Sequence, residues 1–290
     1  YIDNGMIQGK QYALPLIVGN PRILLCNMEI LGKSGFDTPP QTWDELVECT
    51  TKIAAEQPDV YAFPMGWGEP SVGALNNLFY PFLWQAGGDI FDESGKLALD
   101  SAEAVKAAQF IYDLRYKHKV VSESCTSLTD GQLKDAFVNG KAATYITGSG
   151  IANMLKDAPF EWDYTTSLRD KTTGTFAASD SLVLLDSCKN KELATKLMKY
   201  ITSAPTMESL HTKLRSGPPL TKDAKYCDLE KYERMYAKDT GSFHTLPVAS
   251  GMPKVYDTLY KNLQLMMLDE LTPEQALKDT VDYAETVLEQ

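Results

Sequence analysis

Glycine, aromatic and small polar residues gather in the parts of this sequence that could do chemistry. Residues 63–70 place Trp67 between two glycines, and Glu69 follows almost directly. Glycine at such positions permits tight turns or a close backbone approach, and an indole ring offers a broad apolar face with one N–H donor. Trp67 therefore either folds back onto a core or forms a platform for a ligand.

A second segment of this kind is the Gly-Ser-Gly turn around Ser149 and Gly150, which precedes a predicted helix. The first N–H groups of a helix have no partner inside it and favour an oxygen-rich ligand. The turn lacks the spacing of a nucleophile elbow, and the sequence contains no GxGxxG, HExxH or phosphate-loop pattern. The turn therefore favours binding over covalent catalysis.

General acid–base catalysis has little support in the sequence. The histidines are His118, His211 and His244, all in polar contexts, although histidine is the commonest general base. Asp and Glu are abundant enough to build a glycosidase pair, but no spacing selects two of them. The five scattered cysteines form neither a complete disulfide framework nor a zinc motif. We predict buried free thiols and no catalytic residue, metal or cofactor.

The composition excludes several classes of protein. The 290 residues are 43% hydrophobic and 23% charged, which is typical of a globular chain of about two domains. The net charge of −11 and the lack of a Lys/Arg cluster argue against a nucleic-acid partner. The longest apolar stretch, residues 14–31, is interrupted by Gly, Asn, Pro and Arg, so it does not read as a membrane-spanning helix.

Strands and helices alternate along the chain. Apolar runs bounded by turn residues predict strands at residues 12–17, 23–26, 142–146 and 181–185. Helix-start signals predict helices that begin near Thr42, Asp100, Thr129, Leu193 and Thr272. Amides and aromatic rings at residues 76–84 predict one further helix, with most of its rings in the core. This alternation indicates an α/β fold.

The motifs, taken in order, resemble bacterial extracellular solute-binding proteins of family 1, the maltose-binding type that serves ABC importers. The family pattern G-K-x-Y-x-x-P stands at residues 9–15, and G-[LF]-D-x-P-P-x-T-W-[DE]-E-L stands at residues 35–46. W-x-x-G-G follows at residues 84–88, F-x-x-G-K-A-A at 137–143, a Pro-Leu segment at 219–220 and the terminal helix start at 271–277. The ordered set, more than any single motif, carries the resemblance.

The resemblance implies a two-lobed, periplasmic-binding-protein-like (type II) α/β fold with its ligand in the cleft between the lobes. By analogy, the chain crosses between lobes near residues 14–15, 177–178 and 227–228. Residues 1–15 and 175–227 would then form lobe 1, and residues 16–174 and 228–290 would form lobe 2. The family has several elements before the first crossing, so we expect lobe 1 to be incomplete here and a preceding segment to carry a lipoprotein anchor.

The resemblance also implies a set of ligand contacts: Asn20, Arg22, Trp67, Glu69, Ser149, Gly150, Ser179, Asp180 and Tyr256. We expect Trp67 to line the cleft, partly exposed, and Glu69 and Asp180 to accept hydroxyl groups. Arg22 could clamp hydroxyls or a phosphate, or form a surface ion pair. Tyr256 could stack on a sugar or pack on its own lobe.

The implied function is capture of a mono- or oligosaccharide by hinge closure, followed by delivery to the permease subunits of an ABC importer. The protein would act at the extracellular face of the cytoplasmic membrane, as a lipoprotein, or in the periplasm. Residues 147–153 resemble the turn of glycerol-phosphate-binding relatives, so a phosphorylated polyol such as a glycerol-phosphate ester is an alternative ligand. A carbohydrate-active enzyme is the alternative outside this class.

Overall fold

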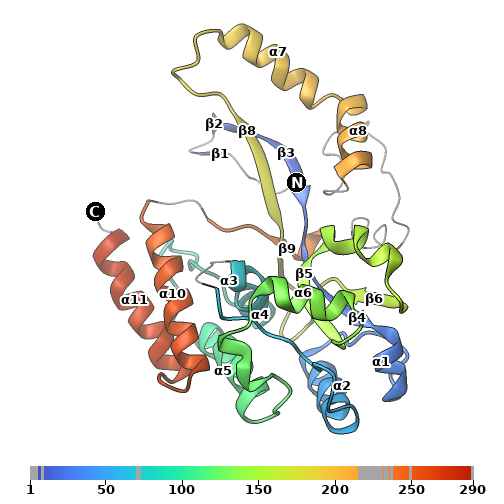
Figure 1. Ribbon diagram of the computed structural model, residues 1–290. Coiled ribbons are helices and arrows are strands. Elements are labelled where there is room, and N and C mark those ends of the chain that lie inside the picture. Colours follow the sequence, from blue (N-terminus) through green and yellow to red (C-terminus); the bar gives the residue numbers. More distant parts are fainter. Residues whose placement is uncertain are drawn as a thin grey trace. The chain divides into compact units, whose positions relative to one another are not determined.

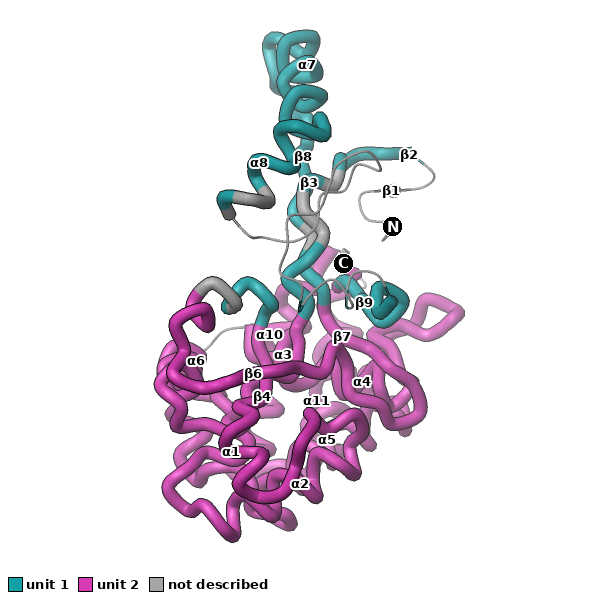
Figure 2. Tube along the Cα trace, turned by 90° about the vertical axis from the view of Figure 1, so that its right-hand side faces the viewer, with its two compact units in different colours: residues 1–21, 148–153, 177–245 teal, residues 22–147, 154–176, 246–290 magenta. Residues whose placement is uncertain are grey.

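The computed structural model describes residues 6–7, 10–69, 73–214, 231, 235, 238–247 and 250–288, and it mixes helices with strands as predicted (Figure 1). The chain forms two compact units (Figure 2). Unit 1 comprises residues 1–21, 148–153 and 177–245, and unit 2 comprises residues 22–147, 154–176 and 246–290. The chain passes from unit 2 to unit 1 at residue 177, beside the second predicted crossing. The third predicted crossing, at residues 227–228, lies outside the described residues, and the lobe boundaries stay a prediction.

Unit 2 contains a three-stranded sheet. Strand β4 (Arg22–Asn27) lies between β5 (Thr144–Gly148) and β6 (Trp162–Thr165), and β6 runs antiparallel to it. Ile23, Leu25 and Cys26 are fully buried. Side chains alternate between the faces of a strand, so both faces of β4 are covered, and the strand reads as an unbroken apolar run.

Unit 2 also contains most of the described helices. They are α1 (Met28–Lys33), α2 (Trp43–Glu56), α3 (Gly73–Leu78), α4 (Tyr80–Gln85), α5 (Ala102–Tyr116), α6 (Asp130–Val138), α10 (Met252–Met267) and α11 (Pro273–Leu288), with the short η1 (Glu123–Thr126) and η3 (Leu155–Asp157). Figure 1 shows α10 and α11 side by side. None of the described helices is long and apolar enough to cross a membrane.

The helix-start signals are confirmed, with two refinements. Thr129 and Gln132 form a complete capping box on α6. On α2 the Thr42 hydroxyl accepts from the N–H of Glu45 at 3.2 Å, but the Glu45 carboxylate accepts from the N–H of Gln41 instead of that of Thr42. Ser101, one residue after Asp100, caps α5. Each cap satisfies N–H groups that have no partner within the helix.

The single helix predicted at residues 76–84 is wrong, because α3 ends at Leu78 and α4 begins at Tyr80. Pro81 stands at the start of α4 and has no N–H with which to continue the helix ladder from α3. The prediction for the rings is confirmed, since Phe79, Tyr80 and Phe82 are fully buried.

A buried glutamine holds the loop that leads into β7 (Thr175–Phe176). Gln85 is 3% exposed, and its side-chain oxygen accepts from the indole N–H of Trp43 at 2.7 Å. Its amide nitrogen donates to the carbonyl of Gly174 at 3.0 Å, and its backbone carbonyl accepts from the N–H groups of Lys171 and Thr172. Every polar group of this side chain is therefore paired, which is the condition for stable burial of a polar residue.

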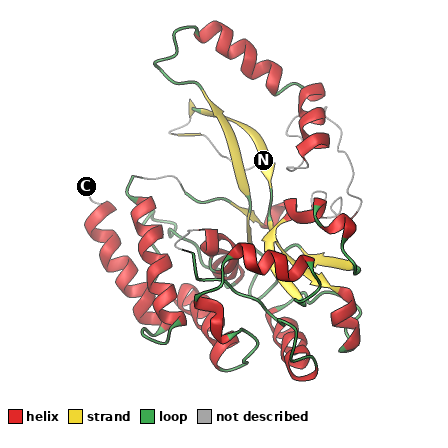
Figure 3. Cartoon of the chain, viewed as in Figure 1, coloured by secondary structure: helices red, strands yellow, loops and turns green. Residues whose placement is uncertain are grey.

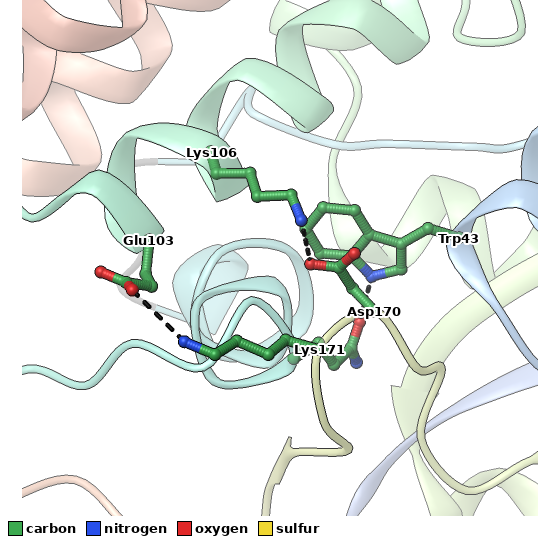
Figure 4. A network of polar contacts seen from close by, with 6 residues as sticks. Trp43, Glu103, Lys106, Asp170 and Lys171 are labelled. Atoms are coloured by element: carbon green, nitrogen blue, oxygen red, sulfur yellow. Dashed lines mark hydrogen bonds and ion pairs between the residues drawn. The ribbon is translucent and has the colours of Figure 1, made fainter.

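Two ion pairs link the same loop to α5 at the surface (Figure 4). Lys106 contacts Asp170 at 2.5 Å, and Lys171 contacts Glu103 at 3.5 Å. The Lys106 ammonium also lies 5.6 Å from the ring centre of Trp43. Both lysine side chains are more than half exposed, at 54% and 65%. Exposed pairs contribute about 0–1 kcal/mol each, so the buried Gln85 contacts dominate the attachment of this loop.

The long strands of unit 1 are β3 (Ala13–Gly19) and β8 (Ala178–Val183), which pair antiparallel and are seen as the long yellow strands of Figure 3. The pairing register shifts between Pro15 and Ile17, as in a β-bulge. The other described elements of unit 1 are β1 (Met6–Ile7), β2 (Lys10–Gln11), η2 (Ser149–Asn153), α7 (Lys191–Ile201), α8 (Ala204–Leu214), η4 (Thr240–Ser242) and β9 (Phe243–His244). The strands predicted at residues 12–17 and 181–185 are thus confirmed with shifted ends.

Candidate functional site

The end of β3 and the turn after β5 meet in unit 1. Asn20 has a backbone φ of 51°, in the left-handed region, and its side-chain oxygen accepts from the N–H of Gly150 at 2.9 Å. The N–H of Ser149 donates to the carbonyl of Pro21 at 3.1 Å. The structure thus brings together three of the predicted site residues, Asn20, Ser149 and Gly150.

This contact changes the chemistry expected of the turn. The N–H of Gly150 was predicted to be available to an oxygen-rich ligand, but in the structure the Asn20 oxygen accepts from it. A ligand oxygen would have to displace the Asn20 carbonyl to reach this donor. Part of the predicted anion-attracting character of the turn is therefore satisfied within the protein.

Ser179 and Asp180 lie on β8, next to the same end of β3. Ser179 pairs with Val18, and Asp180 pairs with Ile17. Asp180 is exposed. Its role as a hydroxyl acceptor stays a prediction.

A polar cluster in unit 2 centres on the carboxylate of Asp130, the first residue of α6. The phenol of Tyr145 donates to Asp130 Oδ1 at 2.7 Å, and the amide of Asn77 donates to the same oxygen at 3.5 Å. Tyr145 is 2% exposed, whereas Asp130 is exposed. Burial raises the pKa of Tyr145, and its hydrogen bond to Asp130 raises this pKa further. Tyr145 therefore stays protonated and donates to the carboxylate.

Arg22 lies beside this cluster, at the start of β4. Its guanidinium carbon is 5.2 Å from the centre of the Phe176 ring, within the range of a cation–π contact. Burial lowers the pKa of Arg22, and the negative charge of Asp130 opposes that shift. An arginine remains charged at any physiological pH, so Arg22 is a cation whose field is already partly balanced by Asp130.

The predicted exposure of Trp67 is wrong, because the residue is 0% exposed. Its ring lies 5.9 Å from that of Tyr260, and its backbone carbonyl accepts from the Tyr260 hydroxyl at 2.6 Å. The flanking glycines explain the burial. A Cβ at Gly68 would stand 2.5 Å from the backbone of Ser127, so glycine allows this loop to pack directly on residues 127–128 and carries Trp67 into the core.

Tyr256 and Glu69 differ in their surroundings. Tyr256 is 8% exposed, and its hydroxyl donates to the carbonyl of Pro247 at 3.1 Å. Its ring lies 6.0 Å from that of Tyr80, so most of it packs within unit 2. Glu69 is exposed. Ligand contact by either residue stays a prediction.

Sequence reasoning missed the three residues that form the Asp130 cluster. Asp130 follows the capping threonine of α6, so the capping box located it, but the pattern says nothing about its partners. Tyr145 is 15 positions away along the chain and Asn77 is 53 positions away. No local motif links such positions.

Comparison with known proteins decides the family. The model of the bacterial extracellular solute-binding protein family matches residues 1–240. The chain belongs to this family. Its members are solute-binding proteins, and the type II α/β fold predicted from the motifs is confirmed by the likeness to solved structures that follows.

Two solved structures and one curated relative illustrate the likeness. The T. maritima MalE3 structure with maltose bound is 26% identical to this chain, with a TM-score of 0.81. The match covers 97% of this chain and 74% of the MalE3 chain. A Thermotoga lettingae solute-binding protein bound with α-D-tagatose is 25% identical and covers 98% of this chain and 74% of its own, with a TM-score of 0.82. The sn-glycerol-3-phosphate-binding periplasmic protein of Salmonella typhimurium is 25% identical and covers 92% of this chain and 65% of its own.

Proposed function

We propose that this solute-binding protein captures a neutral saccharide for an ABC importer. The observation that carries the proposal is the likeness, over 97% of the chain, to a family member whose structure holds maltose. The polar cluster of unit 2 adds chemical support. An exposed carboxylate that is oriented by a tyrosine and an amide, as in Asp130, is a strong acceptor for a sugar hydroxyl.

The charges of the site favour a neutral ligand over a phosphorylated polyol. Arg22, the cation among the predicted contacts, lies in the field of Asp130, and the Gly150 N–H is bonded to Asn20. Asp130, Glu69 and Asp180 are all exposed carboxylates. Near Asp130 or Glu69 in unit 2, or near Asp180 in unit 1, a phosphate would be repelled by a carboxylate, in a protein whose net charge is −11.

A phosphorylated polyol is the second candidate, because one relative is named for binding sn-glycerol-3-phosphate and is 25% identical over 292 residues. Calorimetric titration with maltose, D-tagatose, an arabino-oligosaccharide and sn-glycerol-3-phosphate separates the two classes. We expect at least one neutral saccharide to bind and the phosphate ester to bind more weakly. Tighter binding of sn-glycerol-3-phosphate than of every neutral saccharide would refute the proposal.

Thermal unfolding offers an independent measurement of the same binding. A ligand at 100 times its dissociation constant stabilises the native state by about 2.7 kcal/mol, which raises the melting temperature measurably. We further propose that the protein works outside the cytoplasmic membrane and passes its ligand to permease subunits, in keeping with its extracellular family. Fatty-acid labelling of the protein in its native host tests the lipid anchor that the resemblance implies.

A further inference from the structure

We propose that Asn20 is a positioning residue, whose side-chain oxygen holds the turn at residues 148–150 in the conformation that binds ligand. The family resemblance suggests a direct ligand contact for this residue, whereas the structure shows its oxygen bonded to the turn itself. The inference rests on the proposed function for the effect on affinity. The bond between Asn20 and the turn does not depend on that function.

The backbone of Asn20 is adapted to this bond. Its φ of 51° lies in the left-handed region, which costs free energy for every residue except glycine and is least unfavourable for asparagine and aspartate. The conformation is accompanied by two contacts to the turn. Asn20 Oδ1 accepts from the N–H of Gly150 at 2.9 Å, and the Pro21 carbonyl accepts from the N–H of Ser149 at 3.1 Å. Consecutive donors of the turn therefore bond to consecutive residues at the end of β3.

The turn is equally adapted to Asn20. A Cβ at Gly148 would stand 2.2 Å from Asn20 Oδ1, 2.6 Å from Cγ and 2.7 Å from Nδ2. A Cβ at Gly150 would stand 3.3 Å from the same oxygen. The amide of Asn20 thus fills the space that any side chain at residue 148 would need. The two segments fit each other although 130 positions separate Asn20 from Gly150.

The contact fixes the turn to the paired strands of unit 1. Gly19 pairs with Ala178 of β8, so Asn20 directly follows the last paired residue of β3. The turn carries Ser149 and Gly150, two of the predicted ligand contacts. A turn that is already ordered loses less conformational entropy when ligand binds. Removal of the Asn20 oxygen should therefore weaken binding without any lost contact to the ligand.

Three substitutions separate the side-chain oxygen from the backbone conformation. Asn20→Asp keeps an oxygen acceptor and tolerates the left-handed conformation, whereas Asn20→Gly keeps the conformation and removes the acceptor. Lys119→Gly is the matched control, because Lys119 also has a positive φ, of 56°, and is exposed. Amide hydrogen exchange of the 148–153 segment in the ligand-free protein, together with maltose titration, gives two readouts for each variant.

We expect Asn20→Gly to speed exchange at Gly150 and to raise the maltose dissociation constant, each by about fivefold to tenfold. Asn20→Asp and Lys119→Gly should stay within about threefold of the wild type in both measurements. Gly148→Ala, whose methyl group displaces the Asn20 amide, should reproduce the effects of Asn20→Gly. Far-UV circular dichroism checks that every variant is folded.

The outcomes distinguish the inference from its alternatives. Weaker binding in Asn20→Gly with unchanged exchange at Gly150 would make Asn20 a direct ligand contact and overturn the inference. Faster exchange with unchanged affinity would also overturn it, because the turn would then not govern binding. Equal exchange in the Asp and Gly variants would show that the oxygen does not hold the turn. If the wild type bound no saccharide at all, the proposed function would fail, and the exchange data would still decide whether Asn20 holds the turn.

Discussion

Asp130 combines an exposed carboxylate with a fixed orientation. Tyr145 and Asn77 both donate to its Oδ1, so among the residues that the structure describes the other oxygen keeps its lone pairs for a ligand hydroxyl. Its position as the first residue of α6 places the negative charge at the positive end of the helix dipole. These features make Asp130 a strong acceptor for a sugar hydroxyl.

We predict that Asp130→Asn weakens saccharide binding by about tenfold or more, since a hydrogen bond to a charged group is worth about 1.5–3 kcal/mol. Asp135→Asn is the control, because Asp135 is an exposed acid on the same helix. Calorimetry with the saccharide that binds the wild type measures both variants. Equal affinities in the two variants would remove Asp130 from the site.

Trp67 should matter for folding and not for ligand contact. We predict that Trp67→Ala lowers the free energy of unfolding by about 3–5 kcal/mol, the usual cost of emptying the site of a large core side chain. Its indole N–H is buried and has no hydrogen-bond partner among the residues that the structure describes. Trp67→Phe removes this unpaired donor and should therefore cost less than the alanine variant. Urea denaturation measures both, and a Trp67→Phe protein that is stable but unable to bind saccharide would restore Trp67 to the site.

Among the elements, the loop before β7 is held in place more by the buried side chain of Gln85 than by the surface ion pairs of Asp170 and Lys171. Gln85→Ala leaves the buried indole N–H of Trp43 without its acceptor, whereas the carbonyl of Gly174 loses one donor and keeps the Ser167 hydroxyl, at 2.9 Å. An unpaired buried group costs about 1–3 kcal/mol, and a lost hydrogen bond costs about 0.5–1.5 kcal/mol. We predict a loss of about 2–4 kcal/mol in the free energy of unfolding, with faster amide exchange in residues 167–174.

Glu103→Gln provides the control for this prediction, because it weakens the exposed pair with Lys171 in the same region. Its expected cost is below about 1 kcal/mol. Denaturant unfolding measures the loss of unfolding free energy in Gln85→Ala and in Glu103→Gln, and so shows whether the buried or the exposed contacts contribute more to stability. A larger loss in Glu103→Gln than in Gln85→Ala would contradict the ranking.

Two buried thiols, Cys26 on β4 and Cys49 on α2, make the stability of the protein fall at alkaline pH. The described cysteines Cys26, Cys49, Cys125 and Cys188 are free thiols, and the first three are buried as predicted; Cys227 lies outside the described residues. Burial raises the pKa of Cys26 well above its ordinary value of 9.0 and raises the pKa of Cys49 to about 12. Between pH 9 and 12 the unfolded chain therefore releases protons that the folded chain retains, and stability falls as pH rises.

We predict that the fall in unfolding free energy above pH 9 is less steep in Cys49→Ala than in the wild type. Urea titrations at pH 8, 9 and 10 measure the slope. Parallel slopes for the wild type and Cys49→Ala would show that this thiol does not titrate differently in the two states.

For the molecule as a whole, the exposed apolar face of α7 is the feature that bears on self-association. Leu193, Leu197 and Tyr200 are 62%, 56% and 67% exposed. Their spacing places them on one side of the helix. Exposed apolar groups that lie together mark sites of association. We therefore expect the 290-residue chain, studied alone, to self-associate through this face.

Leu197→Lys should lower the apparent mass of the chain in light scattering at a given concentration. Thr195→Lys adds the same charge to an exposed position of α7 without changing the apolar face, and it should have a smaller effect. If both variants and the wild type were monomeric, the α7 face would not drive association.

The sequence determined the types and order of the elements that carry clear local signals, because caps, prolines and apolar periods act over a few residues. It did not predict α1, β6 or α10. The capping box at Thr129, the proline that opens α11 and the apolar run of β4 all produced the expected structures. The break between α3 and α4 was missed although Pro81 signalled it, since the amides and aromatic rings of residues 76–84 were assigned to one helix.

Only the tertiary structure decided what the site residues do. Trp67 was predicted to line the cleft as a ligand platform. Gly68 instead lets the loop pack on residues 127–128, so the ring of Trp67 lies in the core. Asn20 was predicted to contact the ligand, but its side-chain oxygen accepts a hydrogen bond from the N–H of Gly150, 130 positions away. Such partners depend on how separate elements pack, and that packing is set by long-range burial and close approach, which no local pattern in the sequence records.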